Sequence, residues 1–260
     1  MNRQALHRVI MELLAGKMLG FVLVLMRIGA FFASSPVFSW QAIPVKVKLS
    51  LAILSAVFFS SLVSCPVSIE DTGGPAIGLM MANEAVYGLC LGFVATLLFA
   101  TVKLSARIIE RQMGLSMAQI LDPLSGDSGQ PIGMLMEMIF ILLFLSANGH
   151  HILLLAISKS YEAFPIGAIP SIAKLTEGVI VATSTMLLLG LKMSAPILAT
   201  FLLLMVILAI LARVAPETNI LFLSLPVRVG LGLLMVGIFL PFVSSFIKEF
   251  AQWMDKLIPV

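Results

Sequence analysis

Few residues of this chain are of a type and spacing that could do chemistry. His150 and His151 are adjacent, and neighbouring residues of a helix point about 100° apart, so they do not offer one helix face to a metal. Asp122 begins an Asp-Pro turn, and we interpret Asp127 as a loop residue. The sequence has no nucleophile-elbow, zinc-protease or phosphate-loop signature. We therefore expect no enzyme, no metal site and no cofactor.

Four charged residues lie inside or at the edge of long apolar segments, namely Arg27, Glu84, Glu137 and Lys192. A charge at the depth of a bilayer costs about 2.5–3.5 kcal/mol, so such residues usually face protein or water. One interpretation is that opposite charges pair, Arg27 with Glu84 or Glu137 with Lys192, within the chain or its complex. The alternative is that they line a polar pathway or contact another subunit.

The elements that carry these residues are predicted to be long apolar helices. The chain has 260 residues, of which 60% are hydrophobic and 11% charged, whereas soluble domains have about 25% charged residues. A helix that crosses a bilayer needs about 20 apolar residues. Segments of about that length without charge are 49–69, 85–102, 138–158, 193–212 and 229–247. A sixth apolar segment, 14–38, contains Lys17 near its start and Arg27 in its interior. We predict an all-α, membrane-associated protein with about six such helices.

Small residues and prolines predict close and irregular helix packing. Three pairs have the Gly-x-x-x-Gly spacing that lets helix backbones approach closely: Gly16 and Gly20, Gly74 and Gly78, and Gly88 and Gly92. Pro196, Pro226 and Pro241 predict kinks. Six ordinary spans would divide the basic residues almost equally between the two sides, so the positive-inside rule gives no orientation. Either one span is miscounted, or the helices do not cross the bilayer as independent hairpins.

Residues 111–133, RQMGLSMAQILDPLSGDSGQPIG, interrupt the apolar sequence. Long loops are usually functional or disordered, and this one is too apolar for a disordered linker. It is either an ordinary surface loop with an apolar anchor or a loop buried in a protein cavity. In the second case adaptable methionine side chains suit a seal that opens and re-forms. The candidate seal residues are Gly114, Leu115, Ser116, Met117, Ala118, Ile120, Leu121, Asp122 and Pro123.

At several places the sequence resembles the FliR family, the R subunit of the flagellar type III secretion export gate. The matching segments are RIGAFFASSPVFS (27–39), PVKVKLSLAI (44–53), QMGLSMAQILDP (112–123), LLFLSANGHH (142–151), FPIG (164–167) and ARVAPETNILFLSLPVRVGLG (212–232). Ser224 departs from the glycine expected before the proline, which affects only the local turn.

The resemblance implies a single export-gate domain over 1–260, with a P-like part at about 1–175 and a Q-like helical hairpin at about 176–260. It implies P and Q subunits (FliP and FliQ) and an FlhB-type switch protein as partners, with unfolded flagellar subunits as cargo. The location would be the bacterial inner membrane at the centre of the flagellar basal body. Loop 114–123 would plug the closed channel. Candidate buried-charge or subunit contacts are Arg27, Glu84, Glu137, Lys192, Arg213 and Arg228.

Other readings of the sequence stay open. The T subunit of a virulence injectisome shares this fold and most of the motifs. An ion-coupled transporter would use Glu84 and Glu137 as ion ligands, but transporters tend to contain repeated halves. The only internal similarity is PVKVKL (44–49) with PVRVGL (226–231). The net charge of +3 is scattered, so we expect no nucleic acid partner. The long apolar helices predict contact with membrane lipid.

Overall fold

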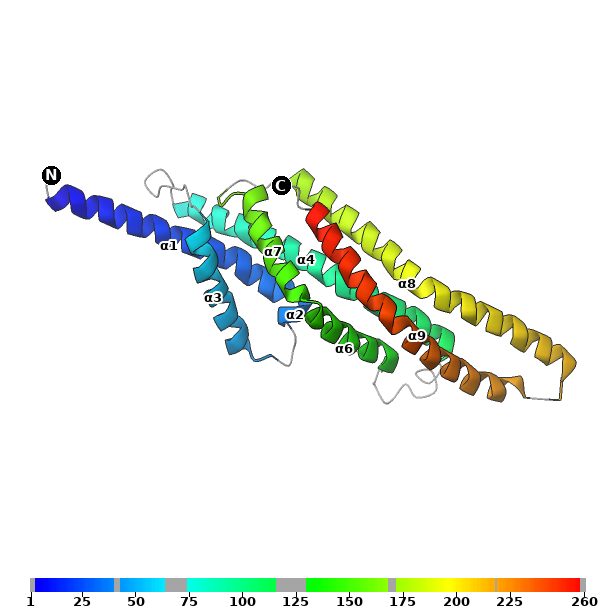
Figure 1. The fold of residues 1–260 in the computed structure, drawn as a ribbon. Helices are drawn as coiled ribbons and strands as arrows, with labels where there is room; N and C mark the ends of the chain where they lie inside the picture. The colour runs from blue at the N-terminus through cyan, green and yellow to red at the C-terminus, as the bar shows by residue number, and fades with distance from the viewer. Residues whose placement is uncertain are drawn as a thin grey trace. The chain divides into compact units, whose positions relative to one another are not determined.

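A computed structural model describes residues 3–39, 43–63, 74–115, 130–167, 172–217 and 219–257. These residues are almost entirely helical and contain no strand (Figure 1). The helices are α1 (Arg3–Ser34), α2 (Pro36–Ser39), α3 (Val45–Leu62), α4 (Gly74–Met113), α6 (Pro131–Ser146), α7 (Gly149–Ala163), α8 (Ile172–Val214) and α9 (Ile220–Leu257). The prediction of an all-α protein with long apolar helices is confirmed.

The number of long apolar helices is smaller than the six expected. Within the described residues, four helices are long and apolar enough to cross a membrane, or five if a bent pair counts as one span. That pair is α6 and α7, which meet at a bend of 69°, so the predicted helix 138–158 is broken. Asn148 at the break has a left-handed φ of 57°, and a Cβ on Gly149 would overlap the ring of Phe144.

The described residues form two compact units, and several helices contribute to both. Unit 1 comprises 1–97, 150–182 and 251–260. Its interior is built on aromatic side chains. Phe31 and Phe32 of α1 pack with Phe38 of α2, and Phe59 of α3 packs with Tyr161 of α7. These contacts bury one face of α1 and of α3.

Unit 2 comprises 98–149 and 183–250. Phe99 of α4 packs edge-on against Phe140 and Phe144 of α6, with ring centroids 5.1 and 5.7 Å away. Phe140 also contacts Phe246 of α9, at 6.2 Å. This aromatic cluster joins α4, α6 and α9.

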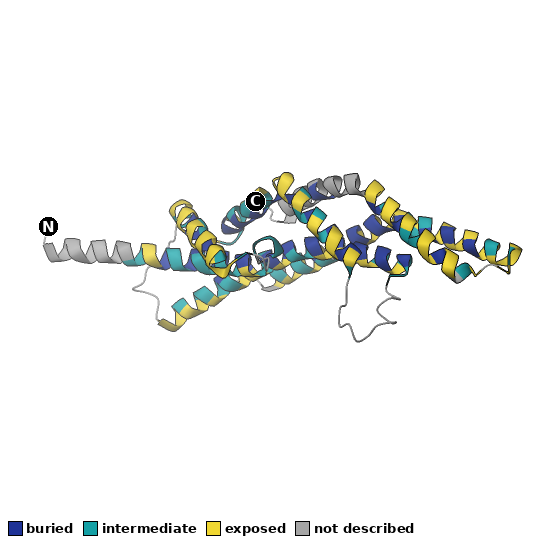
Figure 2. Ribbon diagram, turned by 90° about the horizontal axis from the view of Figure 1, so that it is seen from below, coloured by how far each residue is buried: buried dark blue, intermediate teal, exposed yellow. Residues whose placement is uncertain are grey.

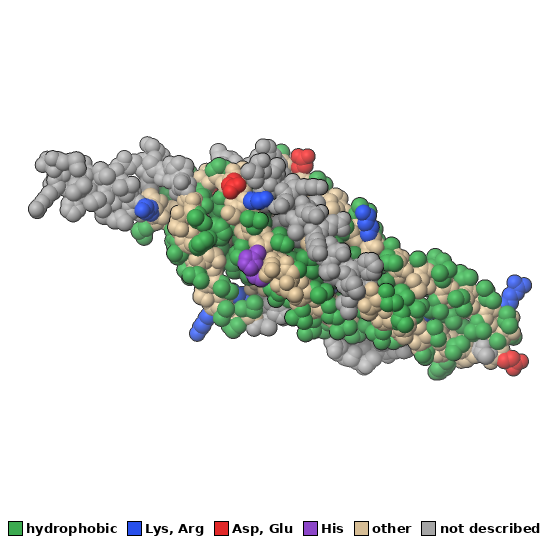
Figure 3. Space-filling model, in the orientation of Figure 1, with side chains coloured by type: hydrophobic (Ala, Val, Ile, Leu, Met, Phe, Trp, Pro, Cys, Tyr) green, Lys and Arg blue, Asp and Glu red, His purple; other side chains and the backbone are tan. Residues whose placement is uncertain are grey.

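Large apolar side chains also cover the outside of the helices. In the most apolar 18-residue stretch of α8, 17% of the residues are buried, and the share in α3 is also 17%. Exposed residues therefore mark long stretches of helix in Figure 2. Hydrophobic side chains dominate the described part of the visible face in Figure 3, where charged groups are few. Such surfaces need lipid or another protein to cover them.

Candidate functional site

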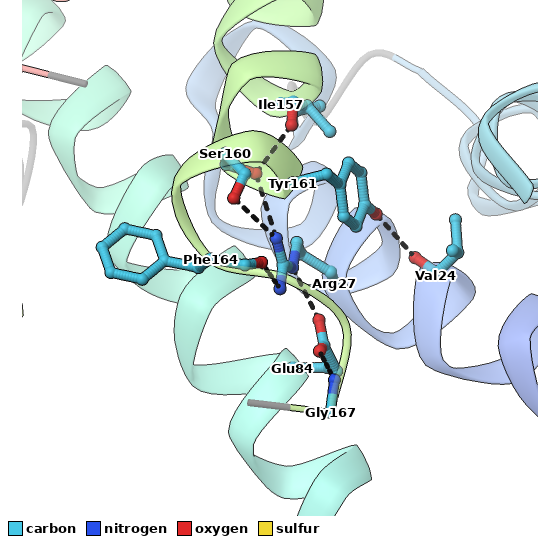
Figure 4. Close-up of polar contacts among 8 residues, drawn as sticks. All are labelled: Val24, Arg27, Glu84, Ile157, Ser160, Tyr161, Phe164 and Gly167. Carbon is cyan, nitrogen blue, oxygen red and sulfur yellow. Dashed lines mark hydrogen bonds and ion pairs between the residues drawn. The ribbon is translucent and has the colours of Figure 1, made fainter. Parts of the chain in front are cut away.

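An arginine and a glutamate form a fully buried ion pair in unit 1. Arg27 lies in α1 and Glu84 in α4, and Arg27 Nε donates a hydrogen bond of 2.6 Å to Glu84 Oε2 (Figure 4). Both side chains are 0% exposed. A buried charge is tolerated when a partner of opposite sign and further hydrogen bonds satisfy it. The structure therefore brings together one of the two pairs that the sequence favours.

The rest of the guanidinium binds the C-terminal end of α7. Arg27 Nη1 donates to the carbonyl oxygen of Ser160 at 3.1 Å and to its Oγ at 3.3 Å. Arg27 Nη2 donates to the carbonyl oxygen of Phe164 at 3.0 Å. The last carbonyls of a helix lack intrahelical partners and carry the negative end of its dipole. Arg27 thus caps a helix that follows it by more than a hundred residues.

Two tyrosine rings enclose the same guanidinium. Arg27 Cζ lies 4.9 Å from the ring centroid of Tyr87 and 4.3 Å from that of Tyr161. An arginine at this distance from an aromatic face is attracted by the ring quadrupole. The Tyr87 ring also stacks on Phe164, with centroids 4.9 Å apart. The aromatic rings exclude water from the ion pair and strengthen it.

Glu84 uses its second oxygen to hold the turn after α7. Glu84 Oε1 accepts a hydrogen bond of 3.0 Å from the backbone N–H of Gly167. Gly167 has a φ of 80°, a left-handed conformation that glycine adopts without steric cost. We call Arg27, Glu84, Ser160, Tyr161, Phe164 and Gly167 the Arg27 cluster. Both Glu84 oxygens are engaged, which speaks against a role for this carboxylate as an ion ligand.

Helices α1 and α4 approach closely beside this cluster because α4 has glycine at positions 88 and 92. A Cβ on Gly88 would overlap the carbonyl oxygen of Arg27 and come 2.9 Å from Ala30 Cβ. A Cβ on Gly92 would overlap Ser34 Oγ. Thr96 Oγ1 donates to the Ser34 carbonyl oxygen at 2.8 Å. Of the three predicted Gly-x-x-x-Gly pairs, Gly88 and Gly92 therefore form a helix contact, whereas Gly16, Gly74 and Gly78 have no described atom within 4 Å of an added Cβ.

The other predicted charges have different surroundings. Glu137 pairs with Lys103 at 2.8 Å and not with Lys192, whose side chain is exposed. Arg213 is also exposed, so neither it nor Lys192 is buried within the single chain. Arg228 is half-buried, and its Nε has no hydrogen-bond partner among the described residues. Contacts of these residues with other subunits stay a prediction.

Polar contacts join the end of α4 to the start of α6 in unit 2. Besides the Lys103–Glu137 ion pair, Arg107 Nε donates to Gln130 Oε1 at 3.1 Å. Glu110 Oε1 accepts from the backbone N–H of Ile132, also at 3.1 Å. The six residues of these three contacts are called the loop base. They tie together the two ends of the segment that contains the candidate seal.

The end of α4, where that segment begins, also contacts α9. Met113, the last residue of α4, is fully buried, and a Cβ on Gly232 would overlap its side chain. Gly114 has a φ of 79°, and the position of a Cβ there lies 3.4 Å from the Leu225 side chain. The chain therefore leaves α4 through a left-handed glycine held against α9.

Most of the candidate seal lies outside the described residues. The structure places Gly114 and Leu115, which are half-buried, while Ser116, Met117, Ala118, Ile120, Leu121, Asp122 and Pro123 fall outside it. The rings of His150 and His151 are 4.3 Å apart. Within the described ranges, no group of three or more His, Cys, Asp or Glu side chains is arranged to hold a metal ion.

Sequence reasoning missed Glu110 and the end of α7. Glu110 is 6% exposed and lies on the helix face that also buries Ala106, Ile109 and Met113. A carboxylate on an otherwise apolar helix face was the available signal, because such a group needs a partner. No sequence pattern indicates that the carbonyl groups of Ser160 and Phe164 accept hydrogen bonds from Arg27, because these contacts depend on where α7 ends.

Comparison with known proteins agrees with this picture. The family model for bacterial export proteins, family 1, matches residues 18–254. The chain is 32% identical over 219 residues to flagellar biosynthetic protein FliR of Bacillus subtilis, covering 83% of this chain and 84% of that one. It is 29% identical to FliR of Escherichia coli, over 86% and 85% of the two chains. It is 28% identical to Yop proteins translocation protein T of Yersinia pestis, over 96% and 98%.

The family match includes every residue of the Arg27 cluster and of the loop base. The resemblance seen in the sequence motifs is thereby confirmed, and the chain belongs to the FliR family, the bacterial export proteins of family 1.

Proposed function

We propose that this chain is a structural, channel-forming subunit of the flagellar type III protein export gate in the bacterial inner membrane, at the centre of the basal body. It would be needed to secrete rod, hook and filament subunits and has no catalytic activity of its own. The observation that carries the proposal is the family match over residues 18–254, together with FliR relatives that align along most of their own length.

Helix length supports membership of a larger assembly. Helix α8 has 43 residues, which at about 1.5 Å per residue extend about 64 Å. The apolar core of a bilayer is about 30 Å thick, and a tilt of about 40° would still leave α8 much too long. Exposed apolar residues occur in both halves of α8, among them Leu187, Leu191, Leu202 and Ile207. Other proteins must cover what lipid does not, and we propose FliP, FliQ and an FlhB-type protein.

Co-expression tests this assembly. We expect the chain expressed alone to aggregate or to be digested rapidly, because its exposed apolar faces lack partners. With P and Q subunits of the same organism it should purify as one stable, protease-resistant complex. The measurements are size-exclusion chromatography and limited proteolysis in the same detergent. A lone chain that is monodisperse and protease-resistant would contradict the proposal.

We also propose that loop 114–123 plugs the closed channel, and that the parts 1–175 and 176–260 correspond to P-like and Q-like regions. The contacts at the loop base support the plug, because they hold both ends of the loop to α4, α6 and α9. A seal made by packing, with no covalent or metal bond, can be displaced by a passing polypeptide.

Deletion of residues 115–119 tests the plug. The deletion should leave gate assembly largely intact but make the membrane leak ions or small solutes, and so slow growth. Conductance or solute uptake is measured in cells where the amount of assembled gate is checked by co-purification. Unchanged permeability with normal assembly would show that this loop is not the seal.

The second candidate function is that of the T subunit of a virulence injectisome. The observation in its favour is the alignment with the Yersinia pestis protein over 96% of this chain. Complementation separates the two candidates. The chain should restore swimming to a strain that lacks its own flagellar R subunit, and should not restore effector secretion to a strain that lacks the injectisome T subunit.

A further inference from the structure

Glu110 is the one buried charged residue of the loop base. It is 6% exposed, whereas the Lys103–Glu137 ion pair is 47% and 19% exposed and Arg107 is exposed as well. An exposed ion pair contributes little to stability, whereas a buried carboxylate that loses its partner is costly. Glu110 therefore dominates the polar contacts that join α4 and α6.

The partner of Glu110 is the beginning of α6. The helix starts with Pro131, which has no N–H, so the Ile132 N–H is the first donor of α6 without an intrahelical acceptor. The residue before the helix, Gln130, makes no side-chain capping hydrogen bond. Glu110 of α4 accepts from Ile132 instead, at 3.1 Å. Its carboxylate also lies at the positive end of the α6 dipole.

We propose that Glu110 is a positioning residue that caps α6 from another helix and thereby fixes where the loop between α4 and α6 returns. This inference rests on the proposed role of loop 114–123 as a plug. The opposite end of the loop is held by Met113 against Gly232 and by Gly114 against Leu225. Described residues of α4, α6 and α9 therefore hold both ends of this segment.

The experiment uses the complete gate purified with its P and Q subunits. Glu110→Ala removes the acceptor, and Glu110→Gln keeps a neutral acceptor of the same size. The matched control is Glu177→Ala, which removes an exposed carboxylate on α8. Amide hydrogen exchange of a peptide that includes Ile132 reports the cap directly, and solute uptake by cells reports the seal.

We expect Glu110→Ala to speed exchange at the start of α6 by about tenfold or more, since a charge-assisted hydrogen bond is lost. Permeability should rise severalfold towards that of the 115–119 deletion, at an unchanged yield of complex. Glu110→Gln should show a smaller change in both measurements. Glu177→Ala should match the wild-type gate.

The two measurements distinguish failure of the capping role of Glu110 from failure of the proposed plug. Unchanged exchange in Glu110→Ala would overturn the capping role, whatever the permeability. Faster exchange without a leak, in a gate that the 115–119 deletion does make leaky, would overturn the positioning role and leave the plug standing. A deletion that causes no leak would overturn the plug itself, and with it the link from Glu110 to the seal.

Discussion

Replacing Glu84 with leucine is expected to prevent assembly of a functional gate. The substitution leaves the Arg27 guanidinium buried without its counter-charge, and it frees the Gly167 N–H that Glu84 also binds. Breaking one partner of a buried ion pair costs about 3–5 kcal/mol, which is a large part of the stability of a domain. We expect the melting temperature and the yield of the purified complex to fall sharply, and swimming to be lost.

Two comparisons make this result specific. Glu137→Gln breaks the partly exposed ion pair with Lys103 and should change stability by about 1 kcal/mol or less. The double variant Arg27→Met with Glu84→Leu removes both buried charges and should recover part of the lost yield. Recovery stays incomplete because the carbonyls of Ser160 and Phe164 lose their donor. A single Glu84→Leu variant with normal swimming would show that the pair is dispensable.

The second large effect is expected from a single added methyl group at Gly88. A Cβ there would overlap the Arg27 carbonyl oxygen, which belongs to helix backbone and cannot move aside alone. Helices α1 and α4 would have to separate, and overpacking of this kind costs about 1–3 kcal/mol or more. Since Arg27 and Glu84 lie on the same two helices, Gly88→Ala should also weaken their ion pair. We expect a lower melting temperature of the complex and reduced swimming.

Gly78→Ala is the matched control on the same helix. No described atom lies within 4 Å of a Cβ at this position, and alanine has a higher helix propensity than glycine. Stability should therefore stay the same or rise slightly. If Gly78→Ala and Gly88→Ala have equal effects, the close approach of α1 and α4 does not matter for stability.

Local sequence rules were sufficient for most of the long helices and for one of the two expected charge pairs. Apolar length located the elements because long runs of apolar residues have few alternatives to helix in a membrane. The pairing of Arg27 with Glu84 followed from the cost of leaving either charge alone. The break at Asn148 was missed because apolar residues on both sides fill a whole span, although Asn-Gly is a turn signal.

Partners set by tertiary structure were beyond these rules. Glu137 was expected opposite Lys192, but α4 and α6 place Lys103 within 2.8 Å of it. Nothing in the spacing of 103 and 137 along the chain indicates this contact. The same reason explains why one Gly-x-x-x-Gly pair forms a tight contact and Gly74 and Gly78 do not. The family resemblance, by contrast, depended only on local motifs and was confirmed.

The Arg27 cluster also has a consequence for synthesis of the chain. Arg27 leaves the ribosome 137 residues before Phe164, whose carbonyl it binds. At about 5–20 residues per second this delay is roughly 7–30 s. Throughout that time α1 carries an arginine whose α7 partners do not yet exist, and only Glu84 of α4, which is 57 residues downstream, can neutralise it. The N-terminal helix is made first, but its contacts with α7 cannot form until residue 164 has been synthesised.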